Sequence, residues 1–100
     1  MGKGQKGTGY SIEIDREARD DLKRLPPTMR NRVANKIEWL ALYADELSHE
    51  GLSNLPLHLK GLKKRREGDW RILYWLYHQE RKLKVYAIMH RSANYNLLIR

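Results

Sequence analysis

Basic side chains gather in the second half of the sequence, in three short segments. The candidates for chemistry there are Lys60, Lys63, Lys64, Arg65, Arg66, Arg71, His90, Arg91 and Tyr95. If the three segments form neighbouring strands, these side chains come together although they are distant in the chain. Arginine stays protonated in proteins, so we expect Arg71 and Arg91 to clamp and neutralise a phosphate group.

Such a cluster suits a reaction that needs neither a metal ion nor a pair of carboxylates, the cleavage of RNA by its own 2′-hydroxyl group. That reaction needs a base for the hydroxyl proton, cations for the phosphorane and an acid for the leaving 5′-oxygen. Lys64 is a candidate base, because neighbouring cations favour a neutral lysine. Tyr95 is the alternative, by orienting the 2′-hydroxyl, and His90 is the candidate proton donor. Passive phosphate binding explains the same residues, and spacing alone favours it over catalysis.

Other kinds of chemistry lack the residues that they need. The sequence has no cysteine, which excludes disulfides, thiolate metal sites and a cysteine nucleophile. Its four histidines are far apart without metal-ligand spacing, and no glycine-rich phosphate loop precedes a helix. The acidic residues Glu17, Asp20 and Asp21 are expected on the outer face of a helix, where they do not converge on a two-metal site. We therefore expect no metal and no cofactor.

The net charge of +8 is unevenly distributed along the chain. Residues 1–57 hold nine Lys and Arg against nine Asp and Glu, whereas residues 58–100 hold eleven against three. A solubilising surface would scatter its charges. A basic half joined to a neutral half favours a polyanionic partner, such as nucleic acid or a machine made of it.

Length and composition predict a single domain. One hundred residues, 41% of them hydrophobic, suffice for one layer of helices on one sheet. Residues 1–9 hold four of the seven glycines and little to bury, so we expect a flexible tail before a domain at 10–100. No run approaches the roughly 18 apolar residues of a membrane span, and the start of the chain is unlike a signal peptide. We expect a cytoplasmic protein that contacts no membrane.

Hydrophobic periodicity predicts an α+β fold of two layers. Asp15 and Thr28 are expected to cap two helices, and Pro26 and Pro27 to end the first of them. Short connections favour an antiparallel meander with the first strand at an edge, so that a helical hairpin packs on a twisted antiparallel sheet. The expected elements are a strand at 10–14, helices at 16–25 and 29–47, a loop at 48–58, and strands at 59–66, 70–77 and 82–89.

The helices can cover only one face of this sheet. In the strand at 70–77, we expect them to cover the face of Trp70, Ile72, Tyr74 and Leu76. The other face then presents Arg71 among Trp75 and Tyr77, which suits a phosphate and a stacked base. On the second helix, Trp39 and Tyr43 either widen the buried stripe or form a docking patch for a partner.

Motifs in the second half of the chain resemble those of the RelE/ParE toxin superfamily. They are LKGL at 59–62, REGDWRILY at 66–74 and HRSANY at 90–95, in the order and at the spacing of that family. The opening of the chain is similar too, with a strand and then Ala18, Leu22 and Leu25 before a proline. The resemblance covers residues 10–95.

The resemblance implies a microbial RNase-like fold and the toxin of a type II toxin–antitoxin system. RelE-like members enter the ribosomal A site, contact rRNA and cleave mRNA without a metal, and a cognate antitoxin neutralises them. By motif, Lys64 matches the basic strand position that serves as candidate base, and Arg71 and Arg91 match the arginines that stabilise the phosphate. Tyr95 matches the tyrosine that acts on the scissile nucleotide, and His90 a position that is histidine in many members.

The strand at 59–66 departs from the family at Lys63 and Arg65, where inward apolar residues are usual. Burying an unpaired charge is costly, so this strand must be bulged, shifted in register or exposed at an edge. Lys63 and Arg66 are therefore alternatives to Lys64 as the basic residue of the site. The candidate RNA-binding residues are Lys60, Lys63, Arg65, Arg66 and Trp75.

The same superfamily contains a rival function. ParE-like members share the fold, poison DNA gyrase and generally lack the catalytic set. Because this chain has arginine at 71 and 91 and tyrosine at 95, the resemblance favours RNA cleavage over gyrase inhibition and over a non-catalytic nucleic-acid binder.

Overall fold

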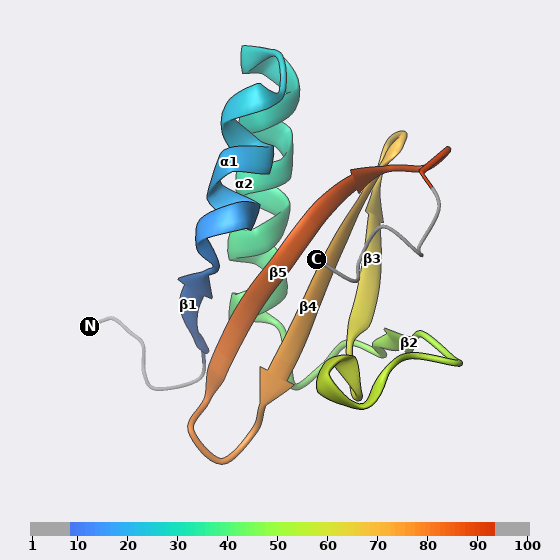
Figure 1. Ribbon diagram of the computed structural model, residues 1–100. Helices are drawn as coiled ribbons and strands as arrows, with labels where there is room; N and C mark the ends of the chain where they lie inside the picture. The colour runs from blue at the N-terminus through green and yellow to red at the C-terminus, as the bar shows by residue number, and fades with distance from the viewer. Residues whose placement is uncertain (1–8, 94–100) are drawn as a thin grey trace, which may run out of the picture.

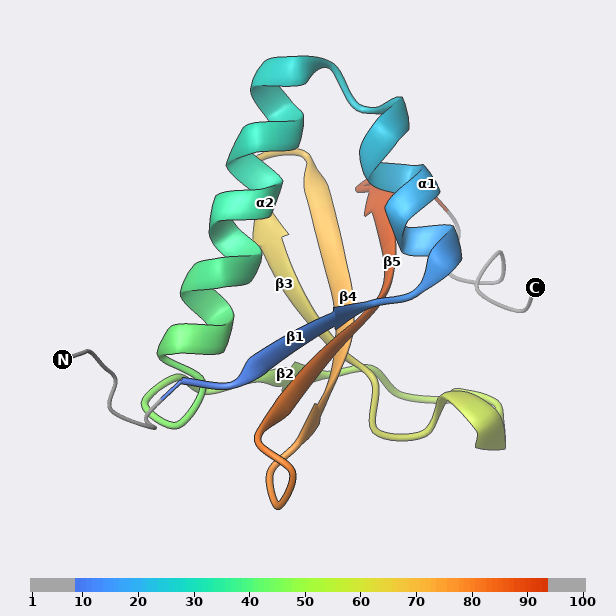
Figure 2. The same ribbon diagram turned by 90° about the vertical axis from the view of Figure 1, so that its left-hand side faces the viewer.

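The computed structural model describes residues 9–93, in which two α-helices cover one face of a five-stranded sheet (Figure 1; Figure 2). In chain order the elements are β1 (Ser11–Ile14), α1 (Arg16–Arg24), α2 (Pro27–Leu42), β2 (Glu50–Gly51), the 3-10 helix η1 (Leu57–Leu59), β3 (Lys63–Glu67), β4 (Trp70–Tyr77) and β5 (Lys82–His90). The predicted α+β architecture of two layers is confirmed. The flexible tail predicted at 1–9 falls almost wholly outside the described residues and stays a prediction.

The sheet is mixed, whereas the sequence predicted an antiparallel one. Its strands lie in the order β1-β5-β4-β3-β2, and β1 is at an edge as predicted. However, β1 runs parallel to β5, with Ser11 opposite Lys82 and Ile14 opposite Val85. A tight turn forces two strands to be antiparallel, but most of the fold separates β1 from β5 in the chain, so no turn fixes its direction.

The helices lie close to their predicted positions, with corrections at their ends. Within the described chain, the Asp15 side chain makes no capping hydrogen bond to α1, and its carboxylate instead pairs with a lysine of β5 at 3.6 Å. α2 begins at Pro27 rather than after Thr28, because a first helical turn does not need the N–H that proline lacks. It ends at Leu42, and turns replace the helix predicted to continue to about Leu47.

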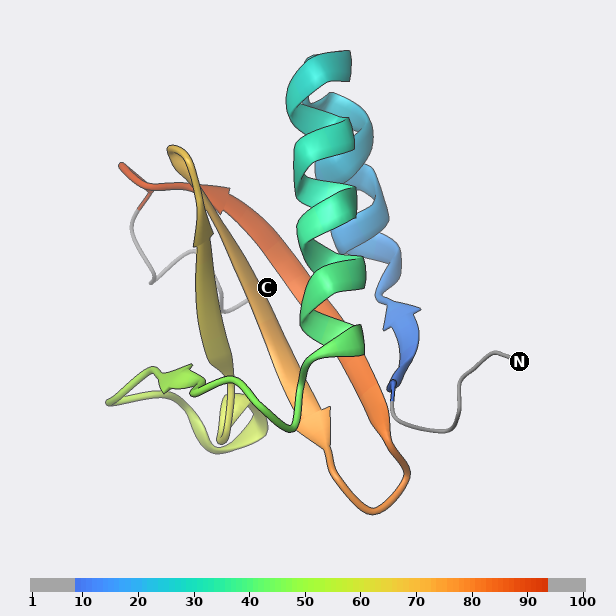
Figure 3. The same cartoon turned by 180° about the vertical axis from the view of Figure 1, so that it is seen from behind.

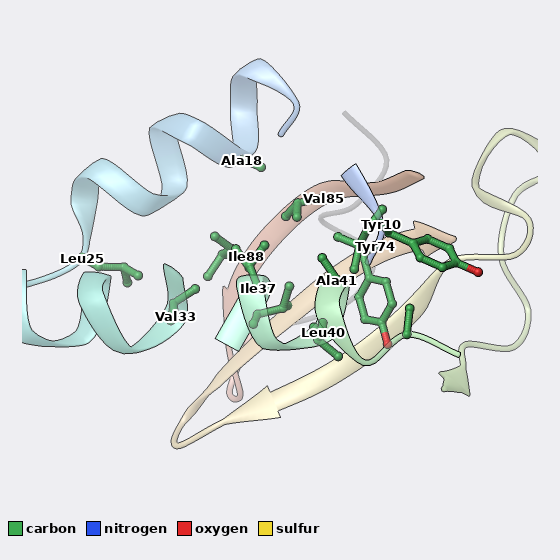
Figure 4. Close-up of a cluster of buried hydrophobic side chains, with 13 residues drawn as sticks. Tyr10, Ala18, Leu25, Val33, Ile37, Leu40, Ala41, Tyr74, Val85 and Ile88 are labelled. Atoms are coloured by element: carbon green, nitrogen blue, oxygen red, sulfur yellow. The ribbon is translucent and has the colours of Figure 1, made fainter. Parts of the chain in front are cut away.

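The main core lies between the helices and the sheet (Figure 4). The stripe of α2 formed by Val33, Ile37 and Leu40 is buried, as the helical periodicity predicted. Ile72 and Tyr74 of β4 belong to the same cluster, which confirms the predicted helix-facing side of that strand. The whole cluster consists of Tyr10, Ala18, Leu25, Val33, Ile37, Leu40, Ala41, Ala44, Ile72, Tyr74, Leu83, Val85 and Ile88.

The other face of the sheet is partly covered, and the prediction that it is open along β4 is wrong. Leu59 and Leu62 are buried in a second cluster with Leu73 of β4 and Ala87 of β5. Figure 3 shows the loop at 52–62 on the side of the sheet away from the helices. This loop leaves the end of the sheet beside the β3–β4 turn as the less covered part of that face.

The segment before β3 differs from its prediction as well. The strand expected at 59–66 begins late, because its first residue ends η1 and Gly61 then turns the chain at a φ of +89°, a conformation that suits glycine. Within the loop expected at 48–58, β2 adds a short strand at the sheet edge, where Glu50 lies opposite Lys64 (Figure 1).

A bulge changes the direction of the last residues of β5. Leu73 and Tyr74 are adjacent in β4, but they lie opposite Ala87 and Val85, which leaves Tyr86 as an extra residue. Because side chains alternate along a strand, the extra residue exchanges the helix-facing and outward positions from there to the end of β5.

Candidate active site

β3 sends its basic side chains alternately to the two faces of the sheet. Arg66 lies opposite Arg71, and Lys64 points the same way, to the face without helices. Lys63 and Arg65 leave on the helix face. The pairing of β3 with β4 is continuous, so neither a bulge nor a register shift accommodates the two unexpected charges. Both side chains are half-buried, and the Arg65 guanidinium donates a hydrogen bond to a backbone carbonyl oxygen.

Lys64, Arg66 and Arg71 line a pocket of about 90 Å³ together with Glu50. The Arg71 guanidinium donates hydrogen bonds to two backbone carbonyl oxygens at the β3–β4 turn, at 3.1 and 3.4 Å. Arg66 and Arg71 face each other directly, and like charges placed in this way destabilise a sheet. A bound anion would remove that repulsion, so the pocket fits a phosphate group.

Sequence reasoning did not identify the fourth residue of this pocket, Glu50. Its carboxylate lies 3.3 Å from the Lys64 ammonium group, and its side chain is 70% exposed. The structure therefore gives Lys64 an acidic neighbour in addition to the basic ones expected. β2 is two residues long, so no alternation pattern in the sequence marks it.

Hydrogen bonds fix the segment just before β2. The Arg65 guanidinium donates to the carbonyl oxygen of Ser48 at 2.6 Å. The ring of His49 donates from Nε2 to the Ala44 carbonyl oxygen at 2.8 Å, so its Nδ1 accepts a hydrogen bond from the Tyr74 hydroxyl at 2.6 Å. Burial raises the pKa of Tyr74, which keeps this hydroxyl protonated. Arg65 thus helps to hold the rim of the pocket in place.

A larger pocket of about 360 Å³ continues from the first around the edge of the sheet. It shares three residues with the first pocket and is lined by Lys36, Ser48, Glu50, Lys64, Arg65 and Arg66. We call the two pockets together the basic groove. The charged groups of Lys36 and Arg65 lie 4.5 and 5.6 Å from the ring centre of Trp39, which is 36% exposed. The aromatic patch considered for Trp39 and Tyr43 therefore borders the basic groove.

Arg91 lies at the same end of the sheet as Arg71, just beyond β5. Met89 is opposite Arg71 in the pairing of β4 with β5, which places Arg91 two residues further along. Its backbone N–H donates to the carbonyl oxygen of Asp69 at 2.7 Å, and its guanidinium lies 3.5 Å from the Asp69 carboxylate. Both side chains are more than 60% exposed, so this ion pair can open at little cost.

His90 and Tyr95 do not join the pocket in the described structure. His90 is opposite Trp70 and contacts its ring edge to face, with ring centres 5.2 Å apart, on the helix side of the sheet. Its Nδ1 lies 2.8 Å from the Ser92 hydroxyl oxygen. Tyr95 lies outside the described residues. The structure thus brings Lys64, Arg66 and Arg71 together and directs His90 to the other face.

The remaining RNA-binding candidates lie further from the pocket. Trp75 is four residues from Arg71, about 13 Å along the strand, with buried Leu73 between them. Its indole N–H donates to the Lys60 carbonyl oxygen at 3.1 Å, and its ring packs against Tyr86. Trp75 therefore fixes the loop at 52–62 to the sheet and does not form a joint platform with Arg71.

No protein-family model matches the sequence, and a search of curated proteins finds no match. Solved structures do match. The toxin–antitoxin complex RelBE2 of Mycobacterium tuberculosis superimposes with a TM-score of 0.71 at 23% identity, over 90% of this chain and 100% of that chain. The archaeal RelE–RelB complex of Pyrococcus horikoshii gives 0.65 at 20%, over 86% and 99%. The isolated RelE toxin of E. coli gives 0.66 at 15%, over 88% and 90%.

The chain has the RelE fold. The resemblance noted in the sequence is thereby confirmed at the level of the fold, and the structure explains two of its motifs. The leucines of LKGL, Leu59 and Leu62, are the residues that pack the loop on the sheet. REGDWRILY spans the β3–β4 turn, in which Gly68 has a φ of +58°. That turn places Arg66 opposite Arg71 in the RelE fold of this chain.

Residues 9–93 hold neither a cluster of metal-ligating side chains nor a helix that could span a membrane. No three His, Asp or Glu side chains of this range gather closely enough to hold a metal ion. None of its helices combines the length and the apolar character needed to cross a membrane.

Proposed function

We propose that this chain is the toxin of a type II toxin–antitoxin pair and that it cleaves mRNA on the ribosome without a metal ion. The observation that carries the proposal is the pocket of Lys64, Arg66 and Arg71 on the open end of a RelE-type sheet. Three cations around one small pocket suit the phosphorane formed when the 2′-hydroxyl of RNA attacks the neighbouring phosphorus.

The C-terminal motif supplies the other proposed groups. Arg91 joins the phosphate when its exposed ion pair with Asp69 opens. Tyr95 orients the 2′-hydroxyl, as its match to the family motif implies. His90 donates the proton to the leaving 5′-oxygen only if the end of β5 rotates when RNA binds, since it now faces Trp70.

The proposed partners are a cognate antitoxin and the ribosome in the cytoplasm. The matching structure from M. tuberculosis is a toxin–antitoxin complex, and the one from P. horikoshii is a complex of RelE with RelB. For this chain we propose a short acidic peptide that covers the basic groove and the bordering Trp39 and Tyr43, because it would satisfy both the charge and the exposed apolar surface.

The test is brief induction of the protein in cells, with mapping of new mRNA 5′ ends and measurement of protein synthesis. Wild type is expected to stop translation and to create new ends within coding regions. Arg71→Ala is expected to abolish both effects, because it removes a cation from the pocket. Arg19→Ala, which removes the same charge from the exposed face of α1, serves as the matched control and is expected to act as wild type.

Three outcomes would contradict the proposal. If translation stops equally well with Arg71→Ala, the pocket is not the catalytic site. If DNA damage appears while protein synthesis continues, the chain acts on gyrase instead. A protein that binds RNA in a salt-dependent manner but creates no new 5′ ends is a binder and not a nuclease.

A further inference from the structure

We propose that Glu50 is a catalytic residue, whose carboxylate takes the proton from the attacking 2′-hydroxyl group. This inference rests on the proposed function and assigns the proton acceptor of that reaction. It comes from the juxtaposition of one carboxylate with the three cations of the pocket.

The chemistry of the pocket residues selects Glu50. Lysine and arginine are protonated at neutral pH, and in that form they donate hydrogen bonds but accept no proton. Among the described side chains that line the pocket, Glu50 alone has a carboxyl group, whose oxygens can accept a proton. Lys64, 3.3 Å from the Glu50 carboxylate, then donates to the phosphorane oxygens and not to the 2′-hydroxyl.

The reaction balances with this assignment. The 2′-oxygen forms a bond to phosphorus, and its proton passes to the Glu50 carboxylate. The bond from phosphorus to the 5′-oxygen breaks, and that oxygen leaves with a proton from a donor of the site or from water. The products are a 2′,3′-cyclic phosphate and a free 5′-hydroxyl group, and Glu50 returns its proton to solvent.

Backbone contacts hold the segment that carries Glu50, although its side chain is 70% exposed. Backbone pairing sets Glu50 opposite Lys64, and Gly51 follows it in the same short strand. The two residues before it are tied to the turn after α2, to β3 and to β4 through the hydrogen bonds of Ser48 and His49. This keeps the Glu50 backbone beside the pocket, and the ion pair with Lys64 at 3.3 Å keeps its carboxylate there.

A role in phosphate binding does not explain the carboxylate. In the described part of the chain, the other charged residues that line the basic groove are cationic. They are Lys64, Arg66, Arg71, Lys36 and Arg65. A negative charge among them weakens the attraction of the groove for RNA. Glu50 therefore lowers the affinity of the groove for RNA. Its role as a proton acceptor explains why a carboxylate lies there despite this loss of affinity.

The variant Glu50→Gln separates these two effects, because it keeps the size of the side chain and removes only its charge. In single-turnover cleavage of mRNA on programmed ribosomes, we expect the rate at saturation to fall about 100-fold or more. We expect binding of a non-cleavable mRNA, with a 2′-deoxynucleotide at the scissile position, to be unchanged or tighter. Glu46→Gln, an exposed glutamate before β2, is the matched control and is expected to match wild type in both assays.

Chemical rescue distinguishes a proton acceptor from a residue that only supports the structure. In Glu50→Ala, added formate is expected to restore cleavage in a saturable manner, because the exposed position admits a small carboxylate. Chloride at equal ionic strength is expected to restore nothing, and formate is expected not to rescue Arg71→Ala. Unchanged thermal unfolding of Glu50→Gln and Glu50→Ala verifies that both variants are folded.

The outcomes distinguish this inference from the proposed function beneath it. If wild type cleaves and Glu50→Gln cleaves as fast or faster, Glu50 is not the base, although the protein is still a nuclease. A loss of rate that formate does not restore, accompanied by weaker binding, would make Glu50 a structural residue. If wild type does not cleave mRNA at all, both the proposed function and the role of Glu50 are refuted.

Discussion

Replacement of Leu62 by alanine tests whether the loop at 52–62 is an integral part of the fold. Leu62 is fully buried in the second cluster, against Leu73 and Ala87. Leu→Ala at such a site costs about 2–5 kcal/mol, from the lost transfer of apolar surface and from the cavity left behind. A loss of about 3 kcal/mol lowers the midpoint of thermal unfolding by roughly 12–24 °C in a domain of this size.

The same loop provides the control for this prediction. Leu57→Ala deletes the same atoms as Leu62→Ala, but Leu57 is 85% exposed, so these atoms are already in water. This variant should change the unfolding free energy by no more than about 0.5 kcal/mol. Urea unfolding of the two variants and of wild type measures the difference directly. If Leu62→Ala is no more destabilised than Leu57→Ala, the loop does not cover the sheet, and the boundary of the candidate site is wrong.

Three further predictions concern charges. The Tyr10 hydroxyl donates a hydrogen bond to Asp45 at 2.8 Å and lowers the pKa of that carboxyl. The ionised Asp45 therefore stabilises the fold above its unfolded-state pKa, and this stabilisation is lost as the pH falls through its folded-state pKa. Asp45→Asn should therefore weaken the loss of stability below about pH 4 in urea titrations, and an unchanged pH profile would contradict this. Arg66→Leu removes the charge facing Arg71 and should raise stability by about 0.2–1 kcal/mol, measured by urea unfolding, whereas a lower stability would show that the charges do not repel. Lys64→Gln should reduce the salt dependence of RNA binding, with a slope of log affinity against log salt smaller by about 0.7, and an unchanged slope would place Lys64 outside the RNA site.

The parts of the fold that local pattern determines could be predicted from the sequence. Alternation of large apolar residues gave the bounds of β4, and the recurrence of Val33, Ile37 and Leu40 gave the buried stripe of α2. The order of the elements then followed from the short connections between them. By contrast, the parallel pairing of β1 with β5 joins segments that lie about seventy residues apart, and no local signal fixes that direction.

Two long-range features explain why the candidate site was only partly predicted. Contacts from Arg65 and Tyr74 hold Ser48 and His49, the two residues before β2. The two residues of β2 have no strand pattern of their own, and Glu50 was missed for that reason. The bulge at Tyr86 reverses the direction of the residues after it. Without the bulge, His90 would point to the same face as Arg71.

The charge of the pocket suits a reaction more than a binding site alone. Lys64, Arg66 and Arg71 with Glu50 carry three positive charges and one negative, which leaves a net charge of +2. A phosphodiester carries one negative charge, and the phosphorane formed by an ionised 2′-oxygen carries two. If Glu50 takes up the proton, the net charge of the pocket rises to +3 as that of the phosphoryl group falls to −2. The attraction between the pocket and the phosphoryl group is then stronger in the transition state than in the ground state, and this difference accelerates the reaction.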